Sequence, residues 1–233
     1  MISKNSFKSY FLVSNEEISI YVKNTSNSEI IFFKKQKINN DSDSFFERDV
    51  QPFFLEKIEQ VESQIKLFID DTVLIVDDKS IFSIGLSLKQ KIENRKITEE
   101  ELKNLLSNGL QQIYTYNPNH LIIHYIIDQF NIDGEAIEDP AEKMISKYLS
   151  INLRFICIEK KLADKYKNLF KKKQILLEKI ISLFYLKEYE HEEEGDLISI
   201  ASKIENGYNK NEIKLIPKKT KKKGFFENFF LSI

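Results

Sequence analysis

The clearest hydrophobic pattern in the chain runs from Leu149 to Cys157, where apolar residues occupy every second position. A period of two over nine residues predicts a half-buried β-strand, because successive side chains of a strand point to opposite faces. Upstream, Thr98 and Glu101 have the spacing of a capping box, in which each residue bonds the backbone amide of the other. This pattern predicts a helix that starts at Thr98.

The residues around these two elements complete an ordered series. The capped helix is expected to bury one apolar face, formed by Leu102, Leu105, Leu106, Leu110 and Ile113. A β-branched and aromatic stretch from His120 to Phe130 predicts a second strand, and Asp133-Gly134 predicts a turn. A last helix near Lys160 to Lys173 has its apolar side chains on one side. Residues 81–173 are therefore expected to fold as strand, helix, strand, turn, strand and helix.

The N-terminal residues predict a small α/β unit. Its expected strands are Ser9–Val13, Ile18–Val22, Ile30–Lys35 and Thr72–Val76. Asp49 is expected to cap a helix that has Pro52 in its first turn. The buried stripe expected on that helix is Phe54, Ile58, Val61, Ile65 and Phe68.

The residues after this series alternate between apolar and polar segments. Residues 174–187 are mostly apolar, and their spacing fits either a helix or a strand, so the pattern leaves the choice open. Asp196 is expected to cap a short helix that places Ile198, Ala201 and Ile204 inward. Gly207 is expected to end that helix. Glu212–Ile216 then reads as an extended segment.

The composition of the chain excludes only a few classes of protein. The 233 residues contain 35 basic and 36 acidic side chains, so the net charge of −1 favours no class of partner. Cys157 is the one cysteine, which excludes an internal disulfide, and its place on an apolar strand face predicts an inert buried thiol. No apolar run reaches the roughly 20 residues that span a bilayer. The first residues lack the apolar core of a secretory signal, so we expect a protein in the cytosol or attached to a membrane from the cytosolic side.

Two groups of residues are candidate metal or catalytic sites. His120, His124 and Asp128 are spaced by four, but four residues of a strand span about 13 Å. Imidazoles that far apart cannot share one zinc ion, so surface histidines on a sheet are expected instead. The acidic run Glu188–Glu194 predicts a solvated loop. The sequence therefore predicts no catalytic residue, no metal ligand and no cofactor.

The C-terminal residues have the pattern of a membrane anchor. A basic run from Lys218 to Lys223, which includes Lys221, Lys222 and Lys223, precedes a short aromatic segment. On a helix, one face would be formed by Phe225, Phe226, Phe229, Phe230 and Ile233. Basic residues beside an apolar helix face favour binding to an anionic membrane interface. Docking of this helix on its own domain remains an alternative, and the aromatic residues favour lipid over nucleic acid.

Residues 81–173 resemble the small subdomain, called 1C, that is inserted in FtsA, the actin-like membrane anchor of the bacterial division ring. The matching features are the capped helix Thr98–Asn104, the strand Leu121–Asp128, Asp139-Pro140 where the family usually has Asn-Pro, the strand Leu153–Ile158, and the helix start Lys161-Leu162-Ala163. FtsA also ends in an amphipathic membrane-targeting helix. The order of elements in residues 7–77 is that of the first actin-like subdomain of FtsA.

The resemblance implies an α+β fold with four parts. These are a small actin-like (1A-type) α/β unit at 1–80, the FtsA-like 1C subdomain at 81–173, a segment at 174–216 that returns to the first unit, and a basic linker with an amphipathic helix at 217–233. Actin-like ATPases hold phosphate with an Asp-x-Gly turn between the first two strands. Here the corresponding turn, Ser14–Glu17, has no glycine and carries two carboxylates. We therefore expect that this chain binds no nucleotide.

The resemblance also implies a function. We expect a non-enzymatic cell division adaptor on the cytoplasmic face of the inner membrane, at the division site, with divisome proteins and anionic lipids as partners. FtsZ binds mainly to the second lobe of FtsA, which this chain lacks, so the resemblance leaves contact with FtsZ open. Self-association is a further expectation, and the alternative is an unrelated peripheral-membrane regulator or small enzyme. The residues expected to contact other proteins are Leu121, Ile122, His124, Ile126 and Asp128, on a strand thought to place Ile122 and Ile126 opposite Ile123 and Ile127.

Overall fold

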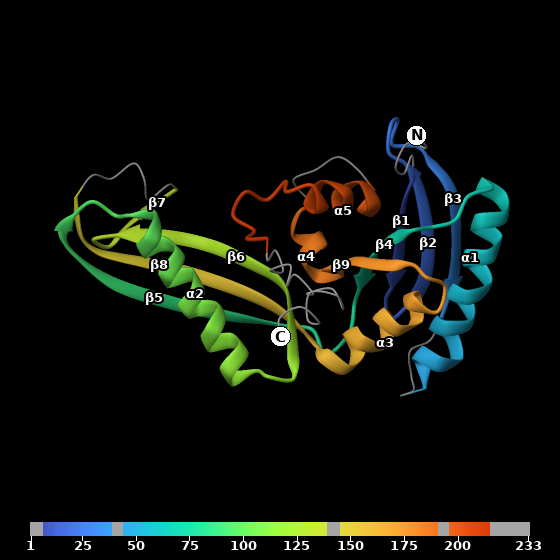
Figure 1. Ribbon diagram of the computed structural model, residues 1–233, viewed down its shortest axis with the longest axis horizontal. Coiled ribbons are helices and arrows are strands. Elements are labelled where there is room, and N and C mark those ends of the chain that lie inside the picture. The colour runs from blue at the N-terminus through green and yellow to red at the C-terminus, as the bar shows by residue number, and fades with distance from the viewer. Residues whose placement is uncertain (1–6, 39–43, 139–144, 191–195, 215–233) are drawn as a thin grey trace, which may run out of the picture.

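The computed structural model describes residues 7–38, 44–138, 145–190 and 196–214, and the strands in these ranges form two sheets (Figure 1). The first sheet has the order β3-β2-β1-β4-β9, with β1 Phe7–Val13, β2 Glu17–Asn24, β3 Ile30–Lys37, β4 Asp71–Val76 and β9 Leu176–Ser182. The second has the order β5-β8-β6-β7, with β5 Phe82–Arg95, β6 His120–Ile132, β7 Glu135–Ile137 and β8 Ser146–Glu159. The predicted α+β class is confirmed.

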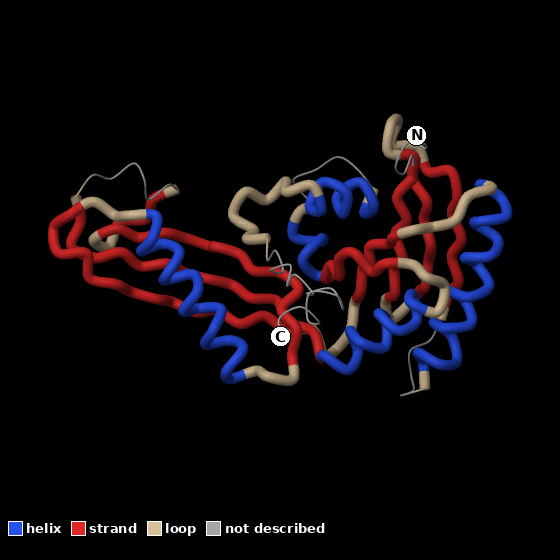
Figure 2. Tube along the Cα trace, in the orientation of Figure 1, coloured by secondary structure: helices blue, strands red, loops and turns tan. Residues whose placement is uncertain are grey.

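The first sheet lies between two layers of helices (Figure 2). The helices are α1 Gln51–Ile65 and α3 Lys160–Lys171 on one face, and α4 Leu183–Glu188 and α5 Leu197–Glu205 on the other. Strands β1, β2 and β3 are antiparallel neighbours, whereas β4 and β9 run parallel to β1. Phe11, Phe54 and Phe170 meet edge to face, with ring centroids 4.8–5.7 Å apart, and join α1 and α3 to the sheet.

The second sheet is covered on one face by α2 Glu99–Tyr116. The alternating residues from Leu149 to Cys157 are buried on this face, as their period of two predicts. The predicted capping box is present: the Thr98 hydroxyl accepts from the Glu101 amide at 3.3 Å, and the Glu101 carboxylate accepts from the Thr98 amide at 2.9 Å. Gly109 lets α2 approach the sheet, because a Cβ at this position would lie 2.7 Å from the Leu153 side chain.

The chain passes twice between the sheets, from β4 to β5 and from β8 through α3 to β9. Ile126 and Ile156 of the second sheet are buried in one cluster with Tyr185 of α4 and Ile198 of α5, the two helices that cover the first sheet. The two sheets therefore share part of a hydrophobic core. No helix in the described ranges is both long and apolar enough to cross a membrane.

Two predictions for the N-terminal unit are wrong. Asp49 does not cap α1, because a π-helical turn, Phe46–Val50, leads directly into the helix, and Asp49 instead bonds Arg48. The helix ends at Ile65, since Lys66 adopts a left-handed conformation with φ 57°. Phe68 therefore lies outside the helix and is 84% exposed.

Residues 174–187 and strand β6 have structures that the hydrophobic pattern alone does not predict. Residues 174–187 contain both structures that the spacing allowed, since β9 is followed directly by α4, whose N-cap is Ser182. In β6, the register shifts between Ile122 and His124, so Ile123 is an extra residue in the strand. The bulge reverses the alternation: Ile122 packs toward α2, whereas Ile126 packs on the other side with Ile156. The expectation that Ile122 and Ile126 share a face is therefore wrong.

Candidate functional site

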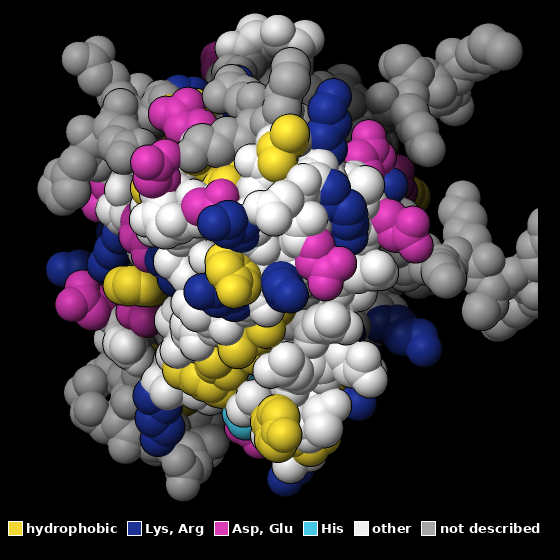
Figure 3. Space-filling view, turned by 90° about the vertical axis from the view of Figure 1, so that its left-hand side faces the viewer, with side chains coloured by type: hydrophobic (Ala, Val, Ile, Leu, Met, Phe, Trp, Pro, Cys, Tyr) yellow, Lys and Arg dark blue, Asp and Glu magenta, His cyan; other side chains and the backbone are white. Residues whose placement is uncertain are grey.

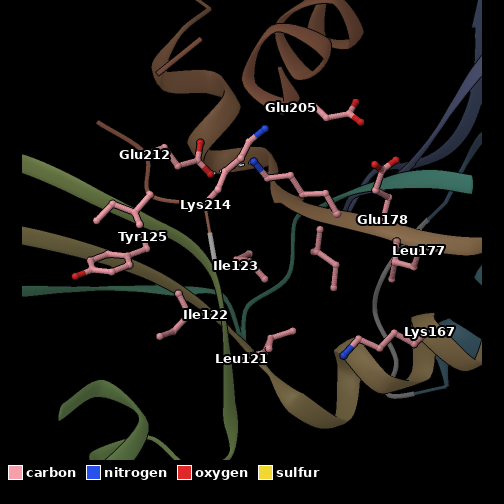
Figure 4. A pocket seen from close by; sticks show the side chains of 13 residues that line it. Leu121, Ile122, Ile123, Tyr125, Lys167, Leu177, Glu178, Glu205, Glu212 and Lys214 are labelled. Atoms are coloured by element: carbon pink, nitrogen blue, oxygen red, sulfur yellow. Dashed lines mark hydrogen bonds and ion pairs between the residues drawn. The ribbon is translucent and has the colours of Figure 1, made fainter. Parts of the chain in front are cut away.

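A groove of about 430 Å³ lies between the two sheets and is the candidate functional site (Figure 4). One wall is β6, from which Leu121 and Ile123 face the groove, and the other is β9, which contributes Leu177 and Ile180. Among the described strands, β9 pairs only with β4, so its second edge faces this groove. The result is an apolar strip beside an unpaired strand edge.

Charged side chains surround this strip, and its carboxylates are already paired. Lys8 forms ion pairs with Glu178 and with Glu205, the second at 2.7 Å. Burial alone would lower the pKa of Lys8, but its hydrogen bonds to these two carboxylates raise it above the ordinary value. Glu205 also accepts a hydrogen bond from the Tyr10 hydroxyl at 3.3 Å. These acids therefore serve to hold α5 and β9 against β1.

Glu212 forms the centre of a second buried network. Its carboxylate lies 3.0 Å from Nδ1 of His124 and 3.0 Å from Nζ of Lys179, and it accepts from the Tyr185 hydroxyl at 3.1 Å. Nε2 of His124 accepts the backbone N–H of Ser182 at 3.1 Å. His124 is therefore the neutral tautomer that carries its proton on Nδ1 and donates it toward Glu212.

The protonation states follow from this geometry. Complete burial lowers the pKa of His124 below its ordinary value, although the Glu212 carboxylate opposes the shift. Burial alone would raise the pKa of Glu212, but the His124 hydrogen bond and the Lys179 charge lower it. A neutral imidazole and an ionised carboxylate thus form the stable pair. The pair joins β6, β9 and the segment after α5, where Ile213 N–H also donates to the Tyr125 carbonyl at 2.7 Å.

The structure places the five expected contact residues in different environments. Ile122, His124 and Ile126 are 8%, 1% and 3% exposed, so their side chains are buried within this chain. The expectation of surface histidines is wrong for His124 for the same reason. Leu121 is half-buried and lines the groove, whereas Asp128 is exposed and pairs with Arg154 at 3.1 Å.

The Ser14–Glu17 turn, for which the sequence analysis expects no nucleotide binding, is closed on itself. The Ser14 hydroxyl accepts hydrogen bonds from the amides of Glu16, at 3.3 Å, and Glu17, at 3.1 Å. Ser14 N–H also donates to the Glu17 carbonyl at 2.9 Å. The amides of Ser14, Glu16 and Glu17 are thus bonded within the turn. Asp77, which follows β4, accepts a hydrogen bond from the Asn15 side chain at 3.5 Å. The Glu17 carboxylate of this turn pairs with Lys35 of β3.

The other residues singled out in the sequence form no further reactive or metal-binding site among the described residues. Cys157 is fully buried, and burial raises the pKa of its thiol to about 11. Glu188 is the last residue of α4 and pairs with Arg154, so the acidic run begins in a helix and not in a loop. Within the described ranges, no three His, Cys, Asp or Glu side chains gather in a way that could hold a metal ion. The proposed membrane-binding residues, Lys221 to Ile233, lie outside the described residues.

Comparisons with known proteins give matches in structure and none in sequence. No family model matches the chain, and a search of curated proteins finds no match. A solved PilM–PilN type IV pilus biogenesis complex superposes with a TM-score of 0.48 at 4% identity, over 78% of this chain and 49% of that one. The cytoplasmic domain of EpsL, from the type II secretion system of Vibrio cholerae, gives 0.38 at 9% identity, over 76% and 57%.

A third match is a Bacteroides thetaiotaomicron protein described as having an actin-like ATPase fold and unknown function. It gives a TM-score of 0.36 at 9% identity, over 82% of this chain and 60% of that one. The present chain therefore spans between about half and three fifths of the solved chains it matches.

Proposed function

We propose that this protein is a non-enzymatic adaptor that is held on the cytoplasmic face of the inner membrane and recruits cell division proteins, as FtsA does. The observation that carries the proposal is the groove between the two sheets, which combines an apolar strip with an unpaired strand edge. Such an edge can accept an extended segment of another protein by main-chain hydrogen bonds, while the apolar strip binds its side chains.

The position of the groove relative to the chain end supports an adaptor at a membrane. Lys214 lines the groove, and the basic run begins at Lys218. The proposed membrane-binding residues begin at Lys221, and seven residues span at most about 25 Å, so a membrane bound by them would lie within about that distance of Lys214. A partner with a short tail that emerges from the same membrane could reach it. The partners proposed are divisome proteins and anionic lipids, without nucleic acid and without a requirement for FtsZ.

The closed Ser14–Glu17 turn supports the absence of nucleotide chemistry. The Glu16 and Glu17 amides are bonded to the Ser14 hydroxyl, and the carboxylates of these two residues would repel a triphosphate. The groove acids are held in ion pairs with Lys8 and Lys179, which leaves them poor candidates for acid–base catalysis. We therefore propose binding, and not catalysis, as the activity of this protein.

Localisation in dividing cells tests the proposal. A fluorescent fusion of the full chain should gather at the division site, and the same fusion ending at Pro217 should spread through the cytoplasm. Even distribution of the full chain over the whole membrane would exclude the division role while leaving membrane attachment intact. A full-length fusion that never reaches the membrane would exclude both.

A further inference from the structure

The last described residues of the chain enter the groove as a short strand beside β6. Ile213 N–H donates to the Tyr125 carbonyl at 2.7 Å, and Ile127 N–H donates to the Asn211 carbonyl at 2.9 Å. These two bonds flank an antiparallel bridge. Because β8 occupies the other edge of β6, residues 211–213 extend the second sheet toward the groove.

Buried contacts hold this strand in place. The side chain of Glu212 is 8% exposed and belongs to the network that includes His124 and Lys179. Just before it, the Asn211 amide donates to the Asn209 side chain at 2.9 Å and forms a turn. The strand leaves this turn in one fixed direction, toward the N-terminal end of β6.

This direction, and not apolar surface alone, selects the groove. Hydrophobic side chains also gather at the end of the second sheet, in a band on the lower half of Figure 3. The strand formed by residues 211–213 runs along β6, and the part of β6 ahead of it lines the groove.

The edge of β6 ahead of the strand is open and apolar. Within the described residues, no strand pairs with this edge from Leu121 to His124. Leu121 and Ile123 line the groove there, and Leu177 and Ile180 of β9 face them (Figure 4). A chain segment that covers these side chains removes apolar surface from water.

The sequence after the strand fits this edge. Leu215, Ile216 and Pro217 follow the last described residue. Three residues of a strand span about 10 Å, so a strand continued from Ile213 to Ile216 reaches the part of β6 that lines the groove. Proline has no N–H to donate and often ends a paired strand.

We propose that Leu215 and Ile216 form a strap that continues the pairing with β6 and covers the apolar strip of the groove. The strap occupies the site until a partner displaces it, so this inference assigns a regulation to the groove and rests on the proposed function. A partner binds only the fraction of molecules whose groove is open, and its apparent affinity falls by that fraction. Removal of the apolar side chains of the strap should therefore strengthen partner binding.

Thiol labelling of the purified full chain measures how open the groove is. Cys157 is fully buried, so a thiol reagent reports the introduced Leu177→Cys, which lies in the groove lining. Leu215→Ser combined with Ile216→Ser should speed its labelling by roughly tenfold, because closed molecules shield it. Leu176→Cys, at a position 65% exposed outside the groove lining, should be labelled equally fast with and without the change in the strap.

Further variants identify the segment that covers the groove. Leu67→Ser combined with Phe68→Ser is the matched control, because it removes two exposed apolar side chains outside the groove lining and should leave labelling of Leu177→Cys unchanged. Labelling that responds to Phe225→Ser with Phe226→Ser, and not to the change in the strap, would show that later residues fill the groove and would overturn the proposal. Labelling that slows as protein concentration rises would assign the cover to a second copy and overturn it equally.

Hydrogen exchange of the unaltered chain keeps the proposal testable if the strap variant folds poorly. At least one amide of Leu215 and Ile216 should exchange roughly tenfold or more slowly than in an unfolded peptide, as paired amides do. Exchange at the unfolded rate for both amides would overturn the proposal. These measurements involve no division protein, so their failure leaves the proposed function untouched. Failure of the proposed function would appear instead as a full-chain fusion that does not gather at the division site.

Discussion

The buried pair of His124 and Glu212 predicts how the stability of the protein depends on pH. Protonation of His124 would place a second proton on Nε2, which already accepts the Ser182 amide, and would charge a fully buried ring. The folded protein therefore keeps His124 neutral below the pH at which the unfolded chain takes up a proton. That pH is about 6.5 for an ordinary histidine.

The sign and size of the effect follow from linkage. Where the unfolded state binds one proton more than the native state, the free energy of unfolding falls as pH falls, by about 1.4 kcal/mol per pH unit. The loss begins near pH 6.5 and continues while folded His124 stays neutral. Glu212, whose pKa is lowered, contributes stability that is lost only as pH falls below its ordinary value of 4.5. The two effects therefore separate if measurements stay above about pH 5.

Urea unfolding at several pH values between about 7.5 and 5.5 measures this slope. His124→Gln removes the titrating group and should lower stability at neutral pH, because Ser182 and Glu212 lose a partner. Its stability should then fall less steeply with pH than that of the unaltered chain. Equal slopes in the unaltered chain and in His124→Gln would refute the assignment.

Four further outcomes follow from the sequence and the fold. Calorimetry with Mg-ATP should give no saturable heat because the Ser14–Glu17 turn is closed and acidic, and a micromolar dissociation constant would contradict this. Phe226→Glu should release the protein from anionic vesicles in a sedimentation assay, and high salt should weaken binding. A chain ending at Pro217 should not pellet with the vesicles, and pelleting of that shortened chain would contradict membrane binding by the C-terminal residues. Thr98→Ala should lower stability by about 1 kcal/mol through loss of the cap, whereas Thr98→Ser should be nearly neutral in the same urea titration. Gly109→Val should cost about 1–3 kcal/mol, because its side chain would overlap Leu153, and an unchanged unfolding midpoint would argue against this close helix–sheet contact.

Local patterns predicted much of the fold because their causes are local. The Thr98–Glu101 capping box, the alternation from Leu149 and the turn at Asp133-Gly134 each depend on residues within a few positions of one another. In the last case both residues adopt positive φ, at 53° and 94°, as a two-residue hairpin turn requires. Asp196 also caps α5 as expected, by accepting from the Ser199 amide at 2.9 Å.

The candidate site depends on contacts that no local pattern records. Glu212 lies 88 positions from His124, and nothing near either residue identifies the other as its partner. The available signal is a histidine in the middle of an apolar strand, and the expectation of a surface residue there is wrong, because His124 is 1% exposed. The bulge at Ile123 is equally hidden, because the partner strand imposes it, and it reverses which side chains of β6 face α2. The tertiary fold thus decided the faces on which the expected contact residues lie.

Site-specific photo-crosslinking in dividing cells tests the central claim, that the groove binds a division protein, most directly. A photoreactive amino acid replaces Leu177, which lines the groove, or Leu176, which is its 65% exposed neighbour outside the groove lining. Both variants must first localise as the unaltered chain does. We predict a crosslink to a division protein from position 177 and not from position 176. Localised variants that give no crosslink at position 177, or the same crosslinks at both positions, would contradict the account.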